Sequence, residues 1–220
     1  MILEELRQKV LDTANLLPKF GLVWMAGGTV CARDPQTGYV IVTPSGMPYE
    51  ALTASDMIVT DINMNLIEGK NRPSVALNLW TGFLLARPDI NAVVHTHSAY
   101  ATAFSVINES IPIITETQAD WFGQPIPVAP YLSVEDKRFS SLPVEVMGTG
   151  FAVLLGQHGP ITVGKSLEHA LERAVTLEEA AHTYAIARSI GNSLIFTDQM
   201  ARSSFDYYHN RYGQRNENLD

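Results

Sequence analysis

Three histidines have the type, spacing and context of metal ligands. His95 and His97 are separated by a single residue, and on an extended strand this spacing places both imidazoles on the same side of the backbone. His158 comes shortly after a second apolar stretch, residues 152–155, so we expect it at a strand end as well. Three histidine ligands leave one coordination position of a zinc ion open, which is typical of catalytic rather than structural zinc. A His-x-His pair alone is more often a coincidence, so the prediction depends on the rest of the sequence.

The elements that must position these histidines follow from hydrophobic periodicity. Apolar residues at helical spacing predict an amphipathic first helix over residues 2–17, closed by Pro18 and Gly21. The apolar strand Ala92-Val93-Val94 leads directly into His95. Between them, short apolar stretches separated by Gly and Pro turns predict a meander of antiparallel strands, at residues 22–25, 39–43 and 57–60.

The second half of the chain alternates between helical and strand patterns. Helical spacing predicts helices over residues 73–86 and 100–106, and a long helix over residues 167–188 that begins with Ser166 as N-cap. Short apolar runs predict buried strands at residues 126–128 and 152–155. These patterns place the chain in the mixed α/β class.

Composition limits the classes of protein to consider. With 220 residues, 46% of them hydrophobic and 17% charged, the chain suits one domain over residues 1–220. A net charge of −8 without any Lys/Arg-rich run argues against nucleic-acid binding and favours a small-molecule substrate. The single Cys31 cannot form an internal disulfide, the first residues lack signal-peptide features, and no apolar run reaches the roughly 18 to 20 residues that span a bilayer. We therefore expect a cytoplasmic protein without membrane contact.

The chain contains the motifs Leu17-Pro18-Lys19-x-Gly21-Leu22-Val23, Pro44-Ser45-Gly46-x-Pro48-Tyr49, Leu52-Thr53-x-x-Asp56-Met57, Ile67-Glu68-Gly69, Arg72-Pro73-Ser74, Arg87-Pro88-Asp89, Val93-Val94-His95-Thr96-His97-Ser98 and His158-Gly159-Pro160. Together these motifs resemble the class II aldolase/adducin family. The resemblance implies an α/β fold with a central, mostly antiparallel sheet flanked by helices, assembled as a homotetramer. It also implies that Zn2+, or another divalent metal, is held by His95, His97 and His158.

The resemblance also implies a chemistry and its acid/base groups. In the family's sugar-phosphate aldolases and 4-epimerases, the metal binds two oxygens of a small ketose or ketose phosphate and stabilises the enediolate left when a carbon–carbon bond breaks. Asp120, in Ala119-Asp120-Trp121-Phe122, and Tyr212, in Tyr212-Gly213-Gln214, resemble epimerase acid/base groups, whereas Ile126-Pro127-Val128-Ala129-Pro130-Tyr131 resembles the aldolases. Glu116 aligns with a mobile tyrosine of the aldolases and is either a relocated acid/base group or a surface glutamate.

The chain departs from the family at the general base. Ala76 stands where the family usually carries a Glu or Asp beside the metal, and positioned proton transfer contributes roughly 10²- to 10⁴-fold to rate. Two alternatives to aldolase or epimerase chemistry therefore stay open. A metal-dependent decarboxylase of an oxo-acid would need no such base, and a non-catalytic adducin-like binding protein would need no reaction at all. The retained histidines argue against the second alternative.

The expected substrate pocket is also altered. Gly28, Thr29, Ser45, Gly46 and Ser74 can offer backbone amides and hydroxyls to an anion, as turn nests do. Thr43 stands where the epimerases have a lysine, so the pattern offers no cation at this pocket and favours a less charged substrate.

Overall fold

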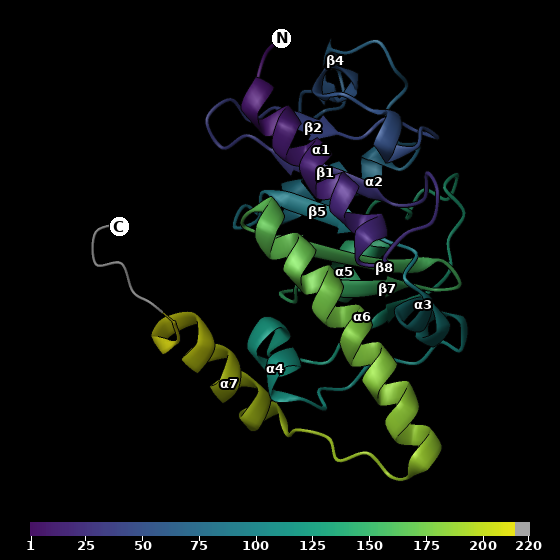
Figure 1. Ribbon diagram of the computed structural model, residues 1–220, viewed down its shortest axis with the longest axis vertical. Helices are drawn as coiled ribbons and strands as arrows, with labels where there is room; N and C mark the ends of the chain where they lie inside the picture. Colours follow the sequence, from purple (N-terminus) through teal and green to yellow (C-terminus); the bar gives the residue numbers. More distant parts are fainter. Residues whose placement is uncertain (214–220) are drawn as a thin grey trace.

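The fold is built on a single sheet with strand order β4-β3-β2-β1-β5-β8-β7-β6 (Figure 1). The computed structural model describes residues 1–213, so Gln214 of the tail motif lies outside this part of the chain. Neighbouring strands run antiparallel, except for the parallel pair β6 and β7. This sheet confirms the predicted fold class. The strands are β1 (Thr29–Arg33), β2 (Val40–Val42), β3 (Ile58–Thr60), β4 (Leu66–Glu68), β5 (Ala92–His95), β6 (Val128–Ala129), β7 (Ala152–Leu155) and β8 (Gly159–Gly164).

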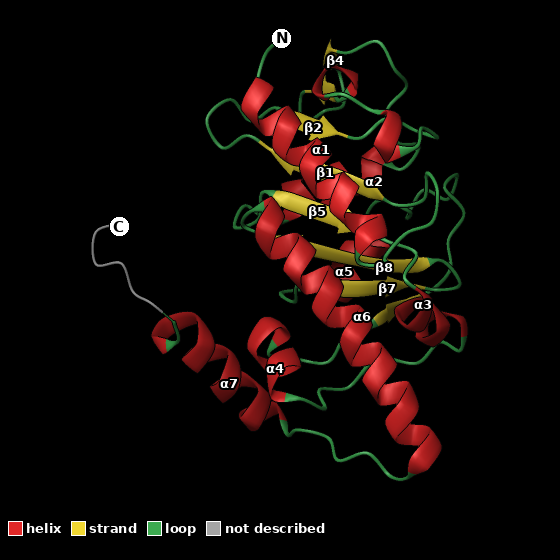
Figure 2. Ribbon diagram, viewed as in Figure 1, coloured by secondary structure: helices red, strands yellow, loops and turns green. Residues whose placement is uncertain are grey.

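Helices flank both faces of the sheet, and Figure 2 shows two of them, α1 and α6, lying across the same face. α2 and α5 pack on the opposite face, while α4 and α7 contact each other beside the middle of α6. The helices are α1 (Glu4–Lys19), α2 (Leu77–Ala86), α3 (Ala99–Val106), α4 (Glu116–Phe122), α5 (Leu142–Met147), α6 (Leu167–Ile190) and α7 (Asp198–Arg211), with two 3-10 turns, η1 (Tyr49–Ala51) and η2 (Ala54–Asp56).

The alternation of side chains along the central strands explains this layering. In β5, Ala92 and Val94 belong to the apolar cluster beneath α1 and α6, whereas Val93 belongs to the cluster against α2. Successive residues of a strand face opposite sides of a sheet. His95, two residues after Val93, therefore faces α2. Cys31 of β1 faces the same side and is fully buried, and burial raises the pKa of its thiol, as suits a small core residue.

The strand predicted at residues 22–25 is wrong, because this segment is a loop and the first strand begins only at Thr29. Leu22 and Val23 are buried in the cluster beneath α1, but Trp24 and Met25 are 75% and 87% exposed. Met25 also has a left-handed φ of 56°, which a strand does not accommodate. The apolar composition of this loop is typical of a strand, but its backbone does not form one.

Most other predicted elements lie within a few residues of their expected positions. α6 begins after Ser166, whose Oγ accepts a hydrogen bond from the His169 amide, as the N-cap prediction required. α2 begins at Leu77 rather than at Pro73, and the strand expected at residues 126–128 is reduced to the short β6. No helix within residues 1–213 is long and apolar enough to cross a membrane. The elements absent from the sequence prediction are β1, β4, β8, α4, α5 and α7, together with the two 3-10 turns η1 and η2.

Candidate metal centre

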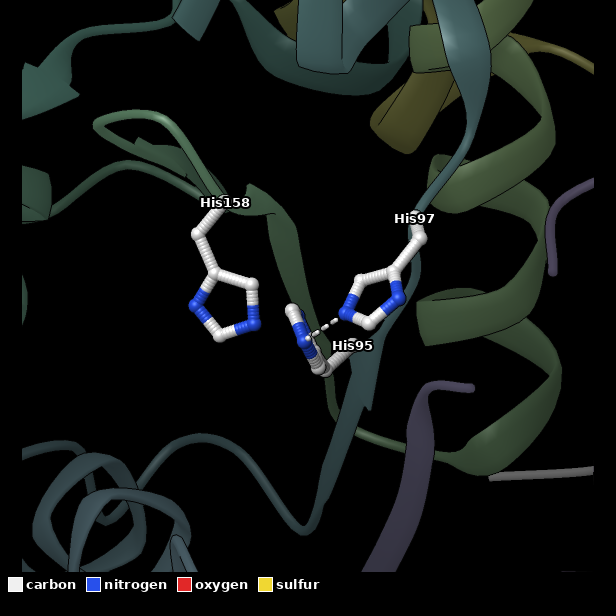
Figure 3. Close-up of side chains that lie close together, drawn as sticks. All are labelled: His95, His97 and His158. Atoms are coloured by element: carbon white, nitrogen blue, oxygen red, sulfur yellow. Dashed lines mark hydrogen bonds between the residues drawn. The ribbon is translucent and has the colours of Figure 1, made fainter. Parts of the chain in front are cut away.

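The three predicted metal ligands converge where the end of β5 and the start of β8 meet, in the middle of the sheet (Figure 3). His95 ends β5, His97 lies two residues further on, and His158 lies in the turn between β7 and β8. β5 and β8 are antiparallel neighbours, with His95 paired to Ile161, so the end of one strand lies beside the start of the other. The candidate ligand atoms of the three imidazoles all lie within 4.8 Å of one another.

Hydrogen bonding fixes the orientation of the most buried of these imidazoles. His95 is 4% exposed, and its Nδ1 lies 3.0 Å from the carbonyl oxygen of Pro160. A carbonyl only accepts, so Nδ1 carries the proton and the lone pair is left on Nε2. Nε2 in turn faces the Nε2 of His97 at 3.0 Å (Figure 3). A carbonyl partner on the second ring nitrogen is the usual arrangement behind a metal-bound histidine.

The protonation of the three histidines also suits a metal. Burial, followed by repulsion from His158 and His97, lowers the pKa of His95 well below its ordinary value. Burial also lowers the pKa of His97, and burial together with His97 lowers that of His158. All three imidazoles are therefore neutral at neutral pH, and a metal does not have to displace protons from them. Imidazole nitrogens suit zinc and related divalent ions, whose ligands stand about 3.4 Å apart in a tetrahedral site, so the set fits such an ion after small side-chain rotations.

Two glycines allow other loops to approach the ligand strand closely. Gly28 has φ 83°, and a Cβ on it would lie 2.7 Å from the carbonyl oxygen of His95. A Cβ on Gly159 would overlap the carbonyl oxygen of Thr96, the residue between His95 and His97. Side chains at either position would push the backbone that carries the imidazoles, so the centre depends on glycine at both.

The residue that replaces the usual base lies beside this centre. Ala76 is 7% exposed and precedes Trp80 by one helical turn, and the Trp80 amide donates to its carbonyl oxygen. The Trp80 indole stacks on the His95 imidazole, with ring centroids 5.3 Å apart. Ala76 therefore presents a methyl group to the apolar cluster at this end of α2, where a carboxylate would have stood. Trp80 is not among the site residues predicted from the sequence, although its i, i+4 spacing from Ala76 could have indicated that it lies on the same side of the helix.

The predicted substrate-binding residues lie in two separate groups. Thr29 is paired with His95 across β1 and β5, and its Oγ1 lies 3.3 Å from the Oγ of Ser74. The Trp80 indole N–H also donates to Ser74 Oγ, at 3.1 Å. Gly28 adjoins Thr29 on the side of the metal ligands.

Ser45 and Gly46 form the second group, in the exposed turn after β2. The Ser45 amide donates to the carbonyl oxygen of Arg72, two residues before Ser74. Arg72 is exposed, and its guanidinium forms no ion pair within residues 1–213. Arg72 is the cation nearest to Ser74 in the sequence, and the expectation that the pocket offers no cation stays a prediction.

The predicted acid/base groups are not brought to the histidines within one chain. Asp120 lies on α4 and accepts a hydrogen bond from Ser204 of α7 at 2.7 Å. Arg173 ties this region to the far end of β8, because it donates to the carbonyl oxygens of Trp121 and Val163. His158 precedes the opposite end of that six-residue strand, and the two ends of such a strand lie roughly 17 Å apart.

Tyr212 and Glu116 belong to the same region as Asp120. Tyr212 follows α7, is 65% exposed and stacks on Tyr208, whose ring in turn packs near Trp121. Glu116 begins α4 and borders an open cavity of about 660 Å³ with Tyr207. Within residues 1–213 the three candidates therefore cluster around α4 and α7, away from the metal centre.

Comparison with known proteins gives the chain its family. The Class II Aldolase and Adducin N-terminal domain family matches residues 8–185. An L-fuculose 1-phosphate aldolase superimposes with a TM-score of 0.89 at 26% identity, covering 93% of this chain and 96% of that one. YgbL from Klebsiella pneumoniae, whose assignment spans aldolase, epimerase and decarboxylase, superimposes with a TM-score of 0.81 at 27% identity, covering 92% and 99%. YgbL from Escherichia coli has the same fold, with a TM-score of 0.83 at 24% identity and coverage of 93% and 100%. With its fold, its histidine cluster and this match over most of its length, the chain belongs to the class II aldolase and adducin N-terminal domain family.

Proposed function

We propose that this protein is a zinc-dependent enzyme that cleaves or rearranges carbon–carbon bonds in a small ketose or ketose phosphate, by retro-aldol cleavage or 4-epimerisation. The observation that carries the proposal is the convergence of His95, His97 and His158, with a carbonyl partner on His95 that turns its free lone pair toward the cluster. Histidines that only packed at strand ends would not need to converge with a free lone pair turned toward the cluster. When bound, the divalent metal would supply the Lewis acidity that stabilises negative charge on the substrate.

The residues around the triad favour a phosphorylated substrate. Gly28, Thr29 and Ser74 lie close to the ligands, and because the Ser74 and Thr29 hydroxyls share one hydrogen bond, one of their two protons is left to be donated to an anion. Arg72 supplies the positive charge that a phosphate would need. The name of the L-fuculose 1-phosphate aldolase agrees with a sugar phosphate as the class of substrate.

The positions of the acid/base groups favour a site shared between copies of the chain. Asp120 and Tyr212 lie too far from His158 to act on a substrate held by the metal of the same protomer. A homotetramer in which α4 and α7 of one copy face the histidines of the next would bring the two groups together. Ring-forming, head-to-tail interfaces allow this arrangement.

Ala76 favours a second candidate, the decarboxylation of a small oxo-acid. In that reaction the bond to the carboxylate breaks, CO2 leaves, and the electron pair remains on the substrate carbon until a proton is added. No group has to remove a hydroxyl proton, so the buried methyl of Ala76 is compatible with it.

Metal content and substrate screening test the proposal. Protein purified without chelator should contain close to one divalent ion per chain, and cleavage of ketose phosphates should disappear after chelation and return with Zn2+. Ala76→Glu should raise retro-aldol activity if the site only lacks its base, whereas release of CO2 from oxo-acids without such a gain favours the decarboxylase. A protein that binds no divalent metal would refute both candidates and leave the adducin-like reading.

A further inference from the structure

The helix that follows the metal ligands is capped from outside its own sequence. α3 begins directly after Ser98, one residue beyond His97, and the Ser98 side chain makes no capping hydrogen bond. The amides in the first turn of a helix have no partner within the helix and need another acceptor. The first turn of α3 therefore depends on a group from elsewhere in the fold.

Glu178 on α6 is that group. Its Oε1 accepts from the Tyr100 amide at 2.8 Å and its Oε2 accepts from the Ala101 amide at 2.9 Å. Both carboxylate oxygens are thus used on two consecutive amides of a helix start, where negative charge is also favoured by the helix dipole. A second contact lies one turn further along α6, where His182 stacks on the Tyr100 ring with centroids 4.0 Å apart.

The position of His97 depends on this junction. Its amide donates to the Leu22 carbonyl at 3.1 Å, and its ring lies against Gly27, so both contacts are with the loop before β1. On its C-terminal side, Ser98 links His97 directly to α3. On this side His97 is therefore held through α3 by Glu178 of the long helix α6, whereas on the other side the buried Thr96 amide donates to the Pro160 carbonyl.

We propose that Glu178 is a positioning residue for the metal centre: by fixing the start of α3 on α6, it holds the His97 imidazole in line with those of His95 and His158. The inference rests on the proposed function only in that the three histidines bind a divalent metal. A ligand whose backbone is free to move has to be ordered when the metal binds, and that ordering lowers affinity. Loss of the Glu178 carboxylate should therefore weaken metal binding without removing any ligand.

The test compares Glu178→Ala and Glu178→Gln with Glu179→Ala, an exposed neighbour on the same helix as matched control. Zn2+ affinity of the metal-free full-length proteins is measured by chelator competition, Co2+ absorption reports ligand geometry, and hydrogen exchange reports the Tyr100 and Ala101 amides. Glu178→Ala should weaken Zn2+ binding about 10- to 100-fold, the range for residues that support metal ligands. It should also alter the Co2+ spectrum and speed exchange at both amides. Glu178→Gln, which keeps one carbonyl acceptor, should show a smaller loss, and Glu179→Ala should match wild type.

Two outcomes overturn the inference, and they differ from each other. If Glu178→Ala frees both amides but binds Zn2+ and Co2+ as wild type does, Glu178 only caps α3, and the proposed function stands. If the wild-type protein binds metal no better than His158→Ala, the proposed function and the inference fail together.

Discussion

The metal centre and the α4–α7 region are built in opposite ways. At the centre, His95 is buried, hydrogen-bonded to Pro160 and stacked on Trp80, so its imidazole is held from several sides. At α4 and α7, Asp120 contacts Ser204 and the Tyr212 side chain is largely exposed. The first region is complete within one chain, whereas the second presents groups capable of proton transfer with no metal-ligand cluster beside them in the described residues.

This difference separates two properties that an active enzyme must combine. Metal affinity should belong to the single protomer, because one chain supplies all three imidazoles. Catalysis should require the oligomer, because the acid/base groups of one chain are separated from its metal ligands by about the length of β8. Substitutions in one region should therefore change metal binding, and substitutions in the other should change turnover alone.

Removal of a ligand should give the largest effect. His158→Ala leaves two imidazoles, and the loss of one of three protein ligands should abolish stoichiometric Zn2+ binding and all metal-dependent turnover. His209→Ala, which changes an exposed histidine of α7, serves as the control. Elemental analysis after dialysis measures the bound ion. Retention of one ion per chain in His158→Ala would mean that the cluster is not the metal site.

Substitution in the second region should lower turnover and leave the metal in place. Asp120→Asn should reduce kcat about 10²- to 10⁴-fold, the usual contribution of an acid/base group, with unchanged Zn2+ content. Ser204→Ala, which removes only the hydrogen bond to Asp120, should have a much smaller effect. A loss of metal from Asp120→Asn would contradict the separation of the two regions.

Mixed assemblies sharpen the same test. When Asp120→Asn and His158→Ala chains are co-expressed, some interfaces combine intact histidines from one copy with an intact Asp120 from the other. With random mixing, about a quarter of head-to-tail sites should regain activity. Two inactive variants that stay inactive when assembled together, with the oligomer verified by light scattering, would place the acid/base group within the same chain as the metal.

Substitution of Trp80 should give an intermediate effect within the metal centre. Trp80→Leu removes the ring that stacks on His95 and should weaken Zn2+ binding about 10-fold, as loss of a support for a metal ligand does. Trp80→Phe keeps an aromatic ring but loses the N–H that donates to Ser74, so it should raise KM more than it weakens metal binding. Chelator competition measures the Zn2+ affinity of each variant, and steady-state kinetics measure its KM. Equal metal affinity in wild type and Trp80→Leu would show that stacking does not orient His95.

The two regions also differ in how far the sequence predicts them. Local patterns predict β5 and β7. The closeness of His95 and His97 follows from β5, because strand periodicity is a property of neighbouring residues. The sequence analysis does not predict β8, because the Gly-Pro pair at its start is typical of a turn. This strand nevertheless pairs with β5 and brings His158 close to His95. The relation of Asp120 to the centre depends on the packing of α4, α6 and α7, which leaves no periodic signal. Glu178 lies 77 residues from Ala101, and such a long-range cap cannot be inferred from either segment alone.

The smallest expected effect concerns the pH dependence of the metal-free protein, and it distinguishes the buried centre from the exposed region. Burial lowers the folded-state pKa of His95 below the usual value of about 6.5, so between the two values the unfolded chain binds a proton that the folded chain does not. The contribution of His95 to stability is therefore fully present above pH of about 6.5 and falls as the pH is lowered below it, by at most about 1.4 kcal/mol per pH unit. Thermal unfolding of the chelated protein from pH 8 to pH 5 should show a decreasing Tm, with a shallower decrease in His95→Gln. Identical slopes in the wild type and in His95→Gln would mean that His95 is not held neutral by burial.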